Sequence, residues 1–415
     1  MASIKSKVPK LRFKGFSGEW NITKLCDISD KVQEKNKNNL INETFTNSAE
    51  YGIINQRDFF NKDISNEINL CHYYVVQPND FVYNPRISNL APVGPIKRNK
   101  LNRTGVMSPL YYVFRTHSIN NDFLDYYFST SKWHRFMFMN GDKGARSDRF
   151  AIGDSVFRTM PILTPKQQEQ TQIGHFFQKL DQVIELQQHA LTQAQNYKKA
   201  MLQKMFPQKG KKVPKVRFKG FSGDWVEKKL GSLVDIYRGL TYKPENIVKN
   251  KIGIRVLRSS NINENTLVLY PDDVFVDSSA VKLNNIQIGD ILITAANGSS
   301  HLVGKHAVIE NELTDTVHGG FMLTLRAKVP FFVNSWMNTY EYKMMLQWVQ
   351  GGNGAIGNLS KPLLEQCKIT LPVHIKEQTQ IGNFFQQLDK QITEQQNKLT
   401  HYQTLKKAML QRLFI

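Results

Sequence analysis

Two stretches of this 415-residue chain occur twice, almost letter for letter, about two hundred residues apart. VPKLRFKGFSGEW at Val8–Trp20 returns as VPKVRFKGFSGDW at Val213–Trp225. QTQIGHFFQKLDQVIELQQ from Gln170 returns as QTQIGNFFQQLDKQITEQQ from Gln378, and this match continues to the end of each copy. The period is too long for a solenoid repeat. It indicates duplication of a whole domain followed by a helix.

The segments between the repeats, residues 21–160 and 226–368, have similar lengths but little identity. A faint common skeleton remains, because QPNDFVYN at Gln77–Asn84 resembles QIGDILIT at Gln287–Thr294. By the same comparison Val93-Gly94 corresponds to Val303-Gly304, and Tyr111 to Phe321. One fold therefore carries two different surfaces, as expected if the two copies recognise different targets.

The glutamine-rich repeats predict two long helices, each preceded by a proline and each with a heptad seam of apolar residues. Matching polar interruptions, Gln187 with Gln395 and Lys198 with Lys406, would fix the register. We expect the helices to pair as an antiparallel coiled coil; the alternative is that each helix lies on its own domain. The predicted interface residues are Ile173, Phe177, Leu180, Ile184, Leu191, Met201, Ile381, Phe385, Leu388, Ile392, Leu399 and Met409.

The intervening regions are rich in β-branched and aromatic residues bounded by Asn, Asp, Gly and Pro, which predicts short strands. Short helices are expected at Asn121–Phe138 and Phe332–Val349. The predicted fold is α+β, with two β-rich domains separated by two long helices in a pseudo-twofold internal duplication. The predicted boundaries are 1–165 for the first domain, 166–206 for the first helix, 207–372 for the linker and second domain, and 373–415 for the second helix.

Lysine and arginine outnumber aspartate and glutamate by 55 to 35, a net charge of +20. Such an excess favours a polyanionic partner, because neutralised phosphates release counterions. A solvated basic surface without a partner is the alternative. Nine lysines or arginines and no acid lie between Lys198 and Lys219, and they fit phosphate contact and a soluble connection equally well.

Catalytic motifs are not recognisable. Asn84-Pro85-Arg86 lacks the second proline and the aromatic residue of an amino-methyltransferase motif, and NGSSHLVGKH at Asn297–His306 departs from a phosphate-binding loop. His301, His306 and His318 have no nearby cysteine to complete a zinc site. We expect no catalytic residue, metal or cofactor on this chain.

The order of variable and repeated segments, together with QTQIGxFFQxLD and KVPKxRFKGFSGxW, resembles the specificity subunit of type I restriction-modification enzymes. The resemblance covers essentially the whole chain. It implies that each variable region is a target recognition domain for one half of a bipartite, asymmetric double-stranded DNA site. The helices would then be the spacer that sets the distance between half-sites.

The resemblance also implies that the chain is a non-catalytic subunit. Its partners would be two modification subunits that methylate adenine with S-adenosylmethionine, and two restriction subunits that use ATP and magnesium. Apart from the resemblance, the three scattered cysteines, Cys26, Cys71 and Cys367, predict a cytoplasmic protein, and no stretch of ~20 apolar residues predicts membrane association. A non-catalytic basic coiled-coil scaffold, or an RNA-binding protein, is the alternative; a nuclease with an unrecognised site is a third.

No motif of the family fixes the base-reading residues, so the candidates come from side-chain chemistry. Arg, Asn and Gln can make paired hydrogen bonds to purine edges, and Lys and Ser mostly hold phosphates. In the first domain the candidates are Asn55, Gln56, Arg57, Tyr83, Asn84, Arg86, Lys97, Arg98, Lys100, Lys143, Arg146 and Arg149. In the second they are Arg258, Ser259, Asn261, Asn297, Ser299, Ser300, His301 and Asn353.

Overall fold

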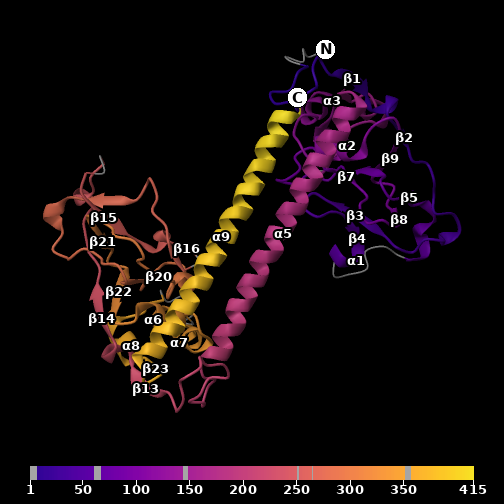
Figure 1. The fold of residues 1–415 in the computed structure, drawn as a ribbon. Helices are drawn as coiled ribbons and strands as arrows, with labels where there is room; N and C mark the ends of the chain where they lie inside the picture. Colours follow the sequence, from indigo (N-terminus) through magenta and orange to yellow (C-terminus); the bar gives the residue numbers. More distant parts are fainter. Residues whose placement is uncertain (1–6, 60–66, 144–147, 250–251, 264, 351–356) are drawn as a thin grey trace. The chain divides into compact units, whose positions relative to one another are not determined.

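The computed structural model describes residues 7–59, 67–143, 148–249, 252–263, 265–350 and 357–415 (Figure 1). Contacts divide the chain into two compact units, residues 1–188 with 398–415, and residues 189–397. We call these unit 1 and unit 2. The parts outside the long helices are domain 1 (residues 7–165) in unit 1 and domain 2 (residues 207–372) in unit 2.

The two predicted long helices are α5 (Gln167–Met205) and α9 (Ile375–Leu413), of 39 residues each. Each has a glutamate in its first turn and a basic residue in its last, Glu169 with Lys204 and Glu377 with Arg412. These charges complement the helix dipole. The predicted boundaries leave each helix whole, whereas the contacts assign the two ends of each helix to different units.

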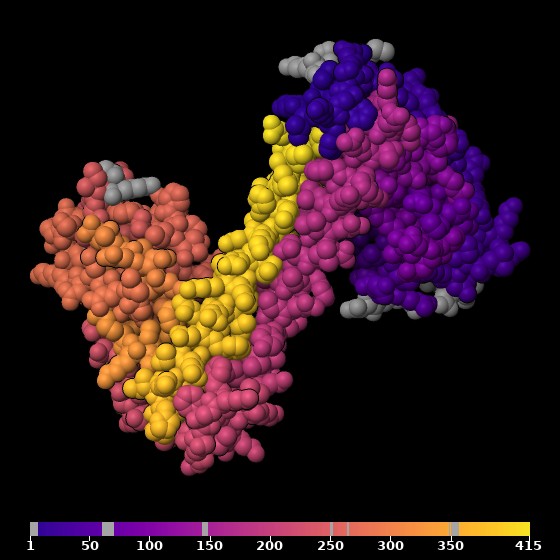
Figure 2. All heavy atoms as spheres, in the orientation of Figure 1, coloured from indigo at the N-terminus to yellow at the C-terminus, as the bar shows by residue number. Residues whose placement is uncertain are grey.

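Within unit 1 the start of α5 packs against the end of α9. The rings of Phe177 and Phe414 stack with their centroids 6.0 Å apart, and Asp181 pairs with Lys406 at 2.5 Å. The yellow end of α9 lies against the indigo and magenta atoms of the same unit in Figure 2. The helices therefore run antiparallel in this unit.

Within unit 2 the end of α5 packs against the start of α9. The rings of Phe206 and Phe385 are 6.0 Å apart, and Lys198 pairs with Asp389. The two units thus repeat one contact with the roles of the helices exchanged. Lys198 and Lys406, predicted as register-fixing interruptions, each pair with an aspartate of the other helix. The alternative in which each helix lies only on its own domain is wrong.

Most of the predicted seam residues are buried. Ile184, Met201, Ile392 and Met409 are half-buried instead. The fully buried members are Ile173, Phe177, Leu180, Leu191, Ile381, Phe385, Leu388 and Leu399.

Domain 1 is built on a four-stranded antiparallel sheet in the order β2-β9-β6-β7. Its strands are β2 (Ser29–Lys31), β9 (Tyr112–Thr116), β6 (Phe81–Tyr83) and β7 (Ile96–Arg98). The other strands pair in twos: β1 (Asn21–Lys24) with β12 (Pro161–Thr164), β3 (Phe45–Ser48) with β4 (Gly52–Asn55), β5 (Tyr74–Val76) with β8 (Gly105–Met107), and β10 (Asp142–Lys143) with β11 (Phe150–Ala151). Its helices are α1 (Gln56–Phe59), α2 (Asn121–Phe128), α3 (His134–Asn140) and α4 (Asp154–Phe157).

Domain 2 repeats the four-stranded sheet in the order β14-β22-β19-β20. Its strands are β14 (Val234–Arg238), β22 (Met322–Ala327), β19 (Ile291–Thr294) and β20 (His306–Val308). The remaining strands are β13 (Val226–Lys229) paired with β23 (Lys368–Leu371), β15 (Ile254–Leu257) between β18 (Val274–Val276) and β21 (Thr316–His318), and β16 (Ile262–Asn263) paired with β17 (Thr266–Leu267). The helices are α6 (Pro330–Met337), α7 (Tyr340–Gln350) and α8 (Lys361–Gln366).

The structure corrects two sequence-based predictions. Each predicted short helix is two helices, α2 with α3 and α6 with α7, separated by residues 129–133 and 338–339. The correspondence of Tyr111 with Phe321 is also wrong by one residue. Phe81 pairs with Phe114 and its counterpart Ile291 with Leu325, so the counterpart of Phe321 is Leu110.

The repeated VPKxRFKGFSGxW segment has a structural role in both units. Arg12 binds Glu169 through two nitrogens at 2.9 and 2.7 Å, and Arg217 binds Glu377 in the same way at 2.6 and 2.8 Å. Both carboxylates are buried. The bidentate pairs fasten the segment before each domain to the first turn of the long helix that follows it.

Candidate nucleic-acid interface

In domain 2 the segment Arg258–Asn261 follows β15 and turns sharply around a buried amide. Asn261 accepts a hydrogen bond from the Arg258 backbone N–H at 2.8 Å, and its Nδ2 donates to Asp273 Oδ1 at 2.7 Å. Asn261 is 0% exposed. Its polar atoms therefore hold the turn from inside, which corrects its prediction as a base-reading residue, whereas Arg258 is exposed to solvent.

A second loop, Asn297–His301, follows β19 and lies beside the first. Asn297 Nδ2 donates to Ser259 Oγ at 2.9 Å, and Asn297 Oδ1 accepts from the Ser299 N–H at 2.9 Å. Ser299 and His301 are exposed, and Ser300 is half-buried. The structure thus brings together two segments that are 38 residues apart and that chemistry alone had singled out.

An exposed phenylalanine that sequence reasoning did not select lies next to these loops. Phe321 is 75% exposed, and its carbonyl accepts from the N–H groups of Ala295 and Ala296 at 2.9 and 3.1 Å. These bonds hold the backbone of Phe321 against Ala295 and Ala296, which directly precede Asn297. A large apolar side chain held in water beside polar loops suits contact with a thymine methyl group or a base face.

In domain 1 the corresponding region is a surface hollow of about 550 Å³. Three predicted residues line it, Gln56, Asn84 and Arg86. Asn84 is itself buried, with its Nδ2 donating to the Asn47 carbonyl at 2.8 Å and its Oδ1 accepting from the Arg86 N–H at 3.0 Å. Asn84 therefore shapes the hollow, and exposed Arg86 can reach out of it.

Counterpart positions identify loop residues in domain 1 that sequence reasoning missed. Because Asn84 occupies the place of Thr294, the segment 87–91 is the counterpart of 297–301. A backbone bridge between Arg86 and Arg149 matches one between Ala296 and Asn358. The bridge places predicted Arg149 beside Arg86, and the missed residues lining the hollow include Ser48, Glu50, Ser88 and Tyr111. The repeat alignment could have found Ser88, since it precedes Val93-Gly94 as Gly298 precedes Val303-Gly304.

Another predicted basic group lies elsewhere in domain 1. Arg98 pairs with Asp122 at 2.5 Å and Lys100 with Asp125 at 2.5 Å, both acids being on α2. Burial lowers the pKa of Lys97, the third member of this group. Among the described residues, none of these three cations lines the hollow near Arg86. Arg98 and Lys100 connect β7 and the residues that follow it to α2 instead.

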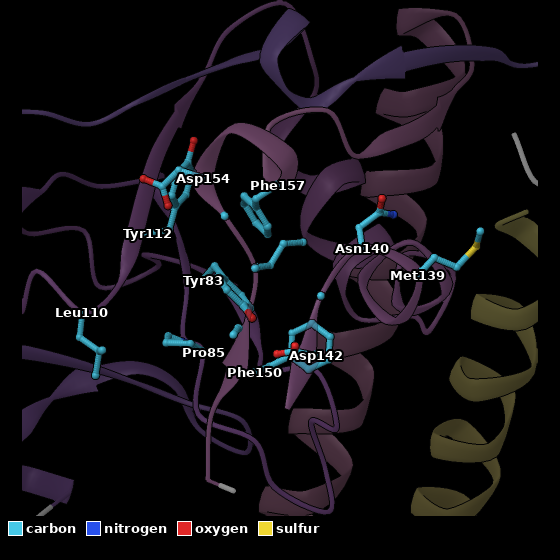
Figure 3. Close-up of a pocket in the computed structure, with 14 residues that line it drawn as sticks. Tyr83, Pro85, Leu110, Tyr112, Met139, Asn140, Asp142, Phe150, Asp154 and Phe157 are labelled. Atoms are coloured by element: carbon cyan, nitrogen blue, oxygen red, sulfur yellow. The ribbon is translucent and has the colours of Figure 1, made fainter. Parts of the chain in front are cut away.

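A second hollow in domain 1, of about 750 Å³, is shown in Figure 3. Predicted Tyr83 lies at its wall with Tyr112, Asp142 and Asp154. Tyr83 is buried and donates its hydroxyl to the Val93 carbonyl at 3.0 Å, and burial raises the pKa of this hydroxyl. The hydroxyl is therefore committed to the domain's interior, which corrects its prediction as a DNA contact.

Asn55 and Arg57 are the remaining candidates whose side chains are described. Asn55 donates to Glu43 Oε1 at 3.0 Å and accepts from the Arg57 N–H at 2.8 Å, and Arg57 is exposed on α1. Lys143 is the last residue of β10, and only its backbone is described. Arg146 and Asn353 lie outside the described residues.

Two of the nine basic residues between positions 198 and 219 are engaged inside unit 2. Lys198 pairs with Asp389 and Arg217 with Glu377. The seven others are exposed, with Lys212 only 4.0 Å from Asp224. Phosphate contact by these seven residues stays a prediction.

Within the parts of the chain that the structure describes, no cluster of histidine, cysteine or acidic side chains has the arrangement of a metal site. In those parts, no helix has the length and apolar character needed to cross a bilayer. What the geometry does present is one duplicated frame that carries two unlike polar loop surfaces. These features are typical of a recognition subunit that carries two different binding surfaces.

The model of the type I restriction modification DNA specificity domain matches residues 17–196 and again residues 222–401. The chain therefore belongs to this family, and it is a DNA sequence-specificity subunit and not a catalytic one. The duplication inferred from the repeats is the duplication of this domain.

Solved structures share the fold over nearly the whole chain. The crystal structure of the type I restriction-modification S subunit from M. genitalium is 14% identical, with a TM-score of 0.64, and the match covers 98% of this chain and 99% of that one. A chain from work on complex assembly and conformational transition of the type I R-M system is also 14% identical, with a TM-score of 0.52, and covers 94% of this chain and 96% of that chain.

Proposed function

We propose that domain 1 and domain 2 each read one half of a bipartite, asymmetric site in double-stranded DNA. One observation carries this proposal: the four-stranded sheets have the same strand order, while the loops above them differ in residues and in pairing. Identical domains would read identical half-sites, so two unlike surfaces favour two unlike half-sites. The net charge of +20 favours a duplex as the partner.

The exposed side chains next to the buried amides are the proposed readers. These are Arg86 in domain 1, and Arg258, Ser299 and His301 in domain 2. Arginine can bind the O6 and N7 atoms of guanine with two hydrogen bonds. Buried Asn84 and Asn261 fix the backbone from which these arginines extend.

The proposal extends to partners and cofactors. The chain would position two modification subunits and two restriction subunits on the site that it reads. S-adenosylmethionine, ATP and magnesium would bind to those subunits and not to this chain. The paired helices would separate the two half-sites by a set distance.

Mapping of methylated adenines in cells that carry single variants tests the proposal. Arg258→Ala should relax the sequence preference in one half-site, by about 5- to 150-fold at one base pair, since a good bidentate contact contributes ~1–3 kcal/mol. Arg86→Ala is the matched variant and should relax the other half-site only. If either variant changed both halves, the assignment of one domain to one half-site would be wrong.

A further inference from the structure

The duplication allows the same place to be compared in the two units. Arg98 pairs with Phe81 across the sheet of domain 1, and Val308 pairs with Ile291 in domain 2. Two residues further along, Lys100 and Glu310 therefore occupy counterpart positions. On the facing helices Asp125 and Tyr126 of α2 correspond to Asn334 and Ser335 of α6.

In unit 1 this place is filled by the chain's own side chains. Lys100 Nζ lies 2.5 Å from Asp125 Oδ2 and 5.7 Å from the centroid of the Tyr126 ring. Tyr126 donates its hydroxyl to Asp181 on α5 at 2.8 Å, and Lys406 of α9 pairs with the same aspartate. A cation and an aromatic ring thus close the space between the domain and the helices.

In unit 2 both filling groups are absent. Serine at 335 is much smaller than tyrosine, and Glu310 has the opposite charge to Lys100. A hollow of about 270 Å³ remains between domain 2 and α9. Its polar wall includes Asn334, Glu310, Gln386, Asp389, Lys390 and Glu394.

Carboxylates outnumber basic groups at this hollow. Three carboxylates, those of Glu310, Asp389 and Glu394, face two lysines, Lys390 in the wall and Lys198, which pairs with Asp389. Burial raises the pKa of Asp389 although Lys198 opposes this shift. Asn334 is 7% exposed, and its Oδ1 accepts no hydrogen bond from the described residues. An unsatisfied buried acceptor of this kind is unfavourable until a donor reaches it.

We propose that this hollow of unit 2 receives a lysine or arginine side chain from a protein partner, at the place where unit 1 holds its own Lys100. The incoming group would donate hydrogen bonds to the acceptors around Asn334 and Asp389. It would also replace Lys390 as the ion-pair partner of Glu310; at present Lys390 Nζ lies 3.3 Å from Glu310 Oε2. A metal ion does not suit the site, since no metal-binding cluster occurs among the described side chains. A protein partner suits it better than nucleic acid, because a phosphate would be repelled by the carboxylates.

The binding test rests on the proposed function, since its partner is the proposed modification subunit. Glu310→Lys copies Lys100 and supplies an internal cation, and Ser335→Tyr restores the ring that Tyr126 supplies in unit 1. Each should weaken binding of the co-expressed modification subunit at least tenfold by titration calorimetry. Glu312→Lys is the matched control, because it makes the same charge change on an exposed residue outside the wall, and it should alter affinity less than twofold. Equal affinities for Glu310→Lys, Glu312→Lys and the unmodified chain would overturn the proposal that the modification subunit fills this hollow.

A second measurement separates the pocket from the proposed partner. Ethylguanidinium chloride, against matched sodium chloride, should shift the Asn334 side-chain amide resonances of the full chain saturably, and Glu310→Lys should abolish the shift. If the modification subunit does not bind but the amide responds, the recruitment proposal fails and the pocket stands. The pocket proposal is wrong if the unmodified chain shows no saturable shift and the pocket variants bind the modification subunit as tightly as the unmodified chain does.

Discussion

Domain 1 and domain 2 have the same four-stranded sheet but differ in the strands beyond it. In domain 1 β3 pairs with β4 and β5 with β8, whereas in domain 2 β15 lies between β18 and β21 in one three-stranded sheet. The shared sheet lies in one hydrophobic core with the repeated apolar residues of the long helices, so its contacts are constrained. Among the described strands outside this sheet, the β1–β12 and β13–β23 pairs also correspond, and the others differ in their pairing. Conserved packing and variable recognition are thus kept on separate parts of each domain.

The comparison of the two domains can be tested first at the phenylalanine that ends each long helix and packs in the core of a domain. The ring centroids of Phe414 and Phe123 are 5.3 Å apart in domain 1, and those of Phe206 and Phe332 are 5.6 Å apart in domain 2. Phe414→Ala should destabilise domain 1 by about 3–5 kcal/mol, because it leaves a cavity in a packed core. Hydrogen exchange followed by mass spectrometry measures each domain separately.

Phe206→Ala is the matched variant and should destabilise domain 2 by a similar amount. Exchange should quicken in domain 1 for the first variant and in domain 2 for the second. Unchanged exchange in domain 1 with Phe414→Ala would contradict the packing of the α9 end in that core.

A smaller difference is expected in the response to acid. His306 is buried in domain 2, and burial lowers its pKa to about 4; its counterpart in domain 1 is Ile96. The pKa of buried His318 is lowered as well. The unfolded chain takes up protons below pH ~6.5, whereas folded His306 does so only near pH 4.

The stabilising contribution of neutral His306 is therefore complete above pH ~6.5 and is lost as the pH falls toward 4. The loss is about 3 kcal/mol, at ~1.4 kcal/mol for each pH unit. Domain 2 should lose protection from exchange at a higher pH than domain 1, and His306→Ile should reduce the difference. Loss of both domains at one pH, with or without His306, would refute this assignment.

The smallest effect is expected at a glycine that occupies the same position in each domain. Gly94 and Gly304 have φ angles of +81° and +87°, where a side chain is strained. A Cβ at Gly94 would lie 2.1 Å from the Asn84 carbonyl oxygen, whereas one at Gly304 would meet the Leu346 side chain at 2.4 Å. A side chain can move more easily than a backbone carbonyl.

Gly94→Ala should therefore cost about 2 kcal/mol and Gly304→Ala about 1 kcal/mol, including the strain of a left-handed residue. Urea denaturation followed by domain-resolved exchange measures both. A larger cost at Gly304 would mean that Leu346 is held more rigidly than its contacts indicate.

Part of the candidate interface could be predicted from the sequence. Residue chemistry selected Arg258 and Asn297, and the structure joins their loops through Ser259. The same reasoning also selected Tyr83 and Asn261, whose polar atoms face inward. It missed Phe321, because an isolated phenylalanine in a sequence gives no sign of whether it is buried or exposed.

The sequence by itself determined the duplication, the two long helices, their paired seams and the family. These are repeated or periodic patterns, which a chain displays along its own length. Only the tertiary structure decided which residues meet across long separations, as Arg12 meets Glu169 and Phe123 meets Phe414. It also decided that Lys100 fills a space that Glu310 leaves open. Such contacts depend on burial and on the positions of distant segments, and no local pattern encodes them.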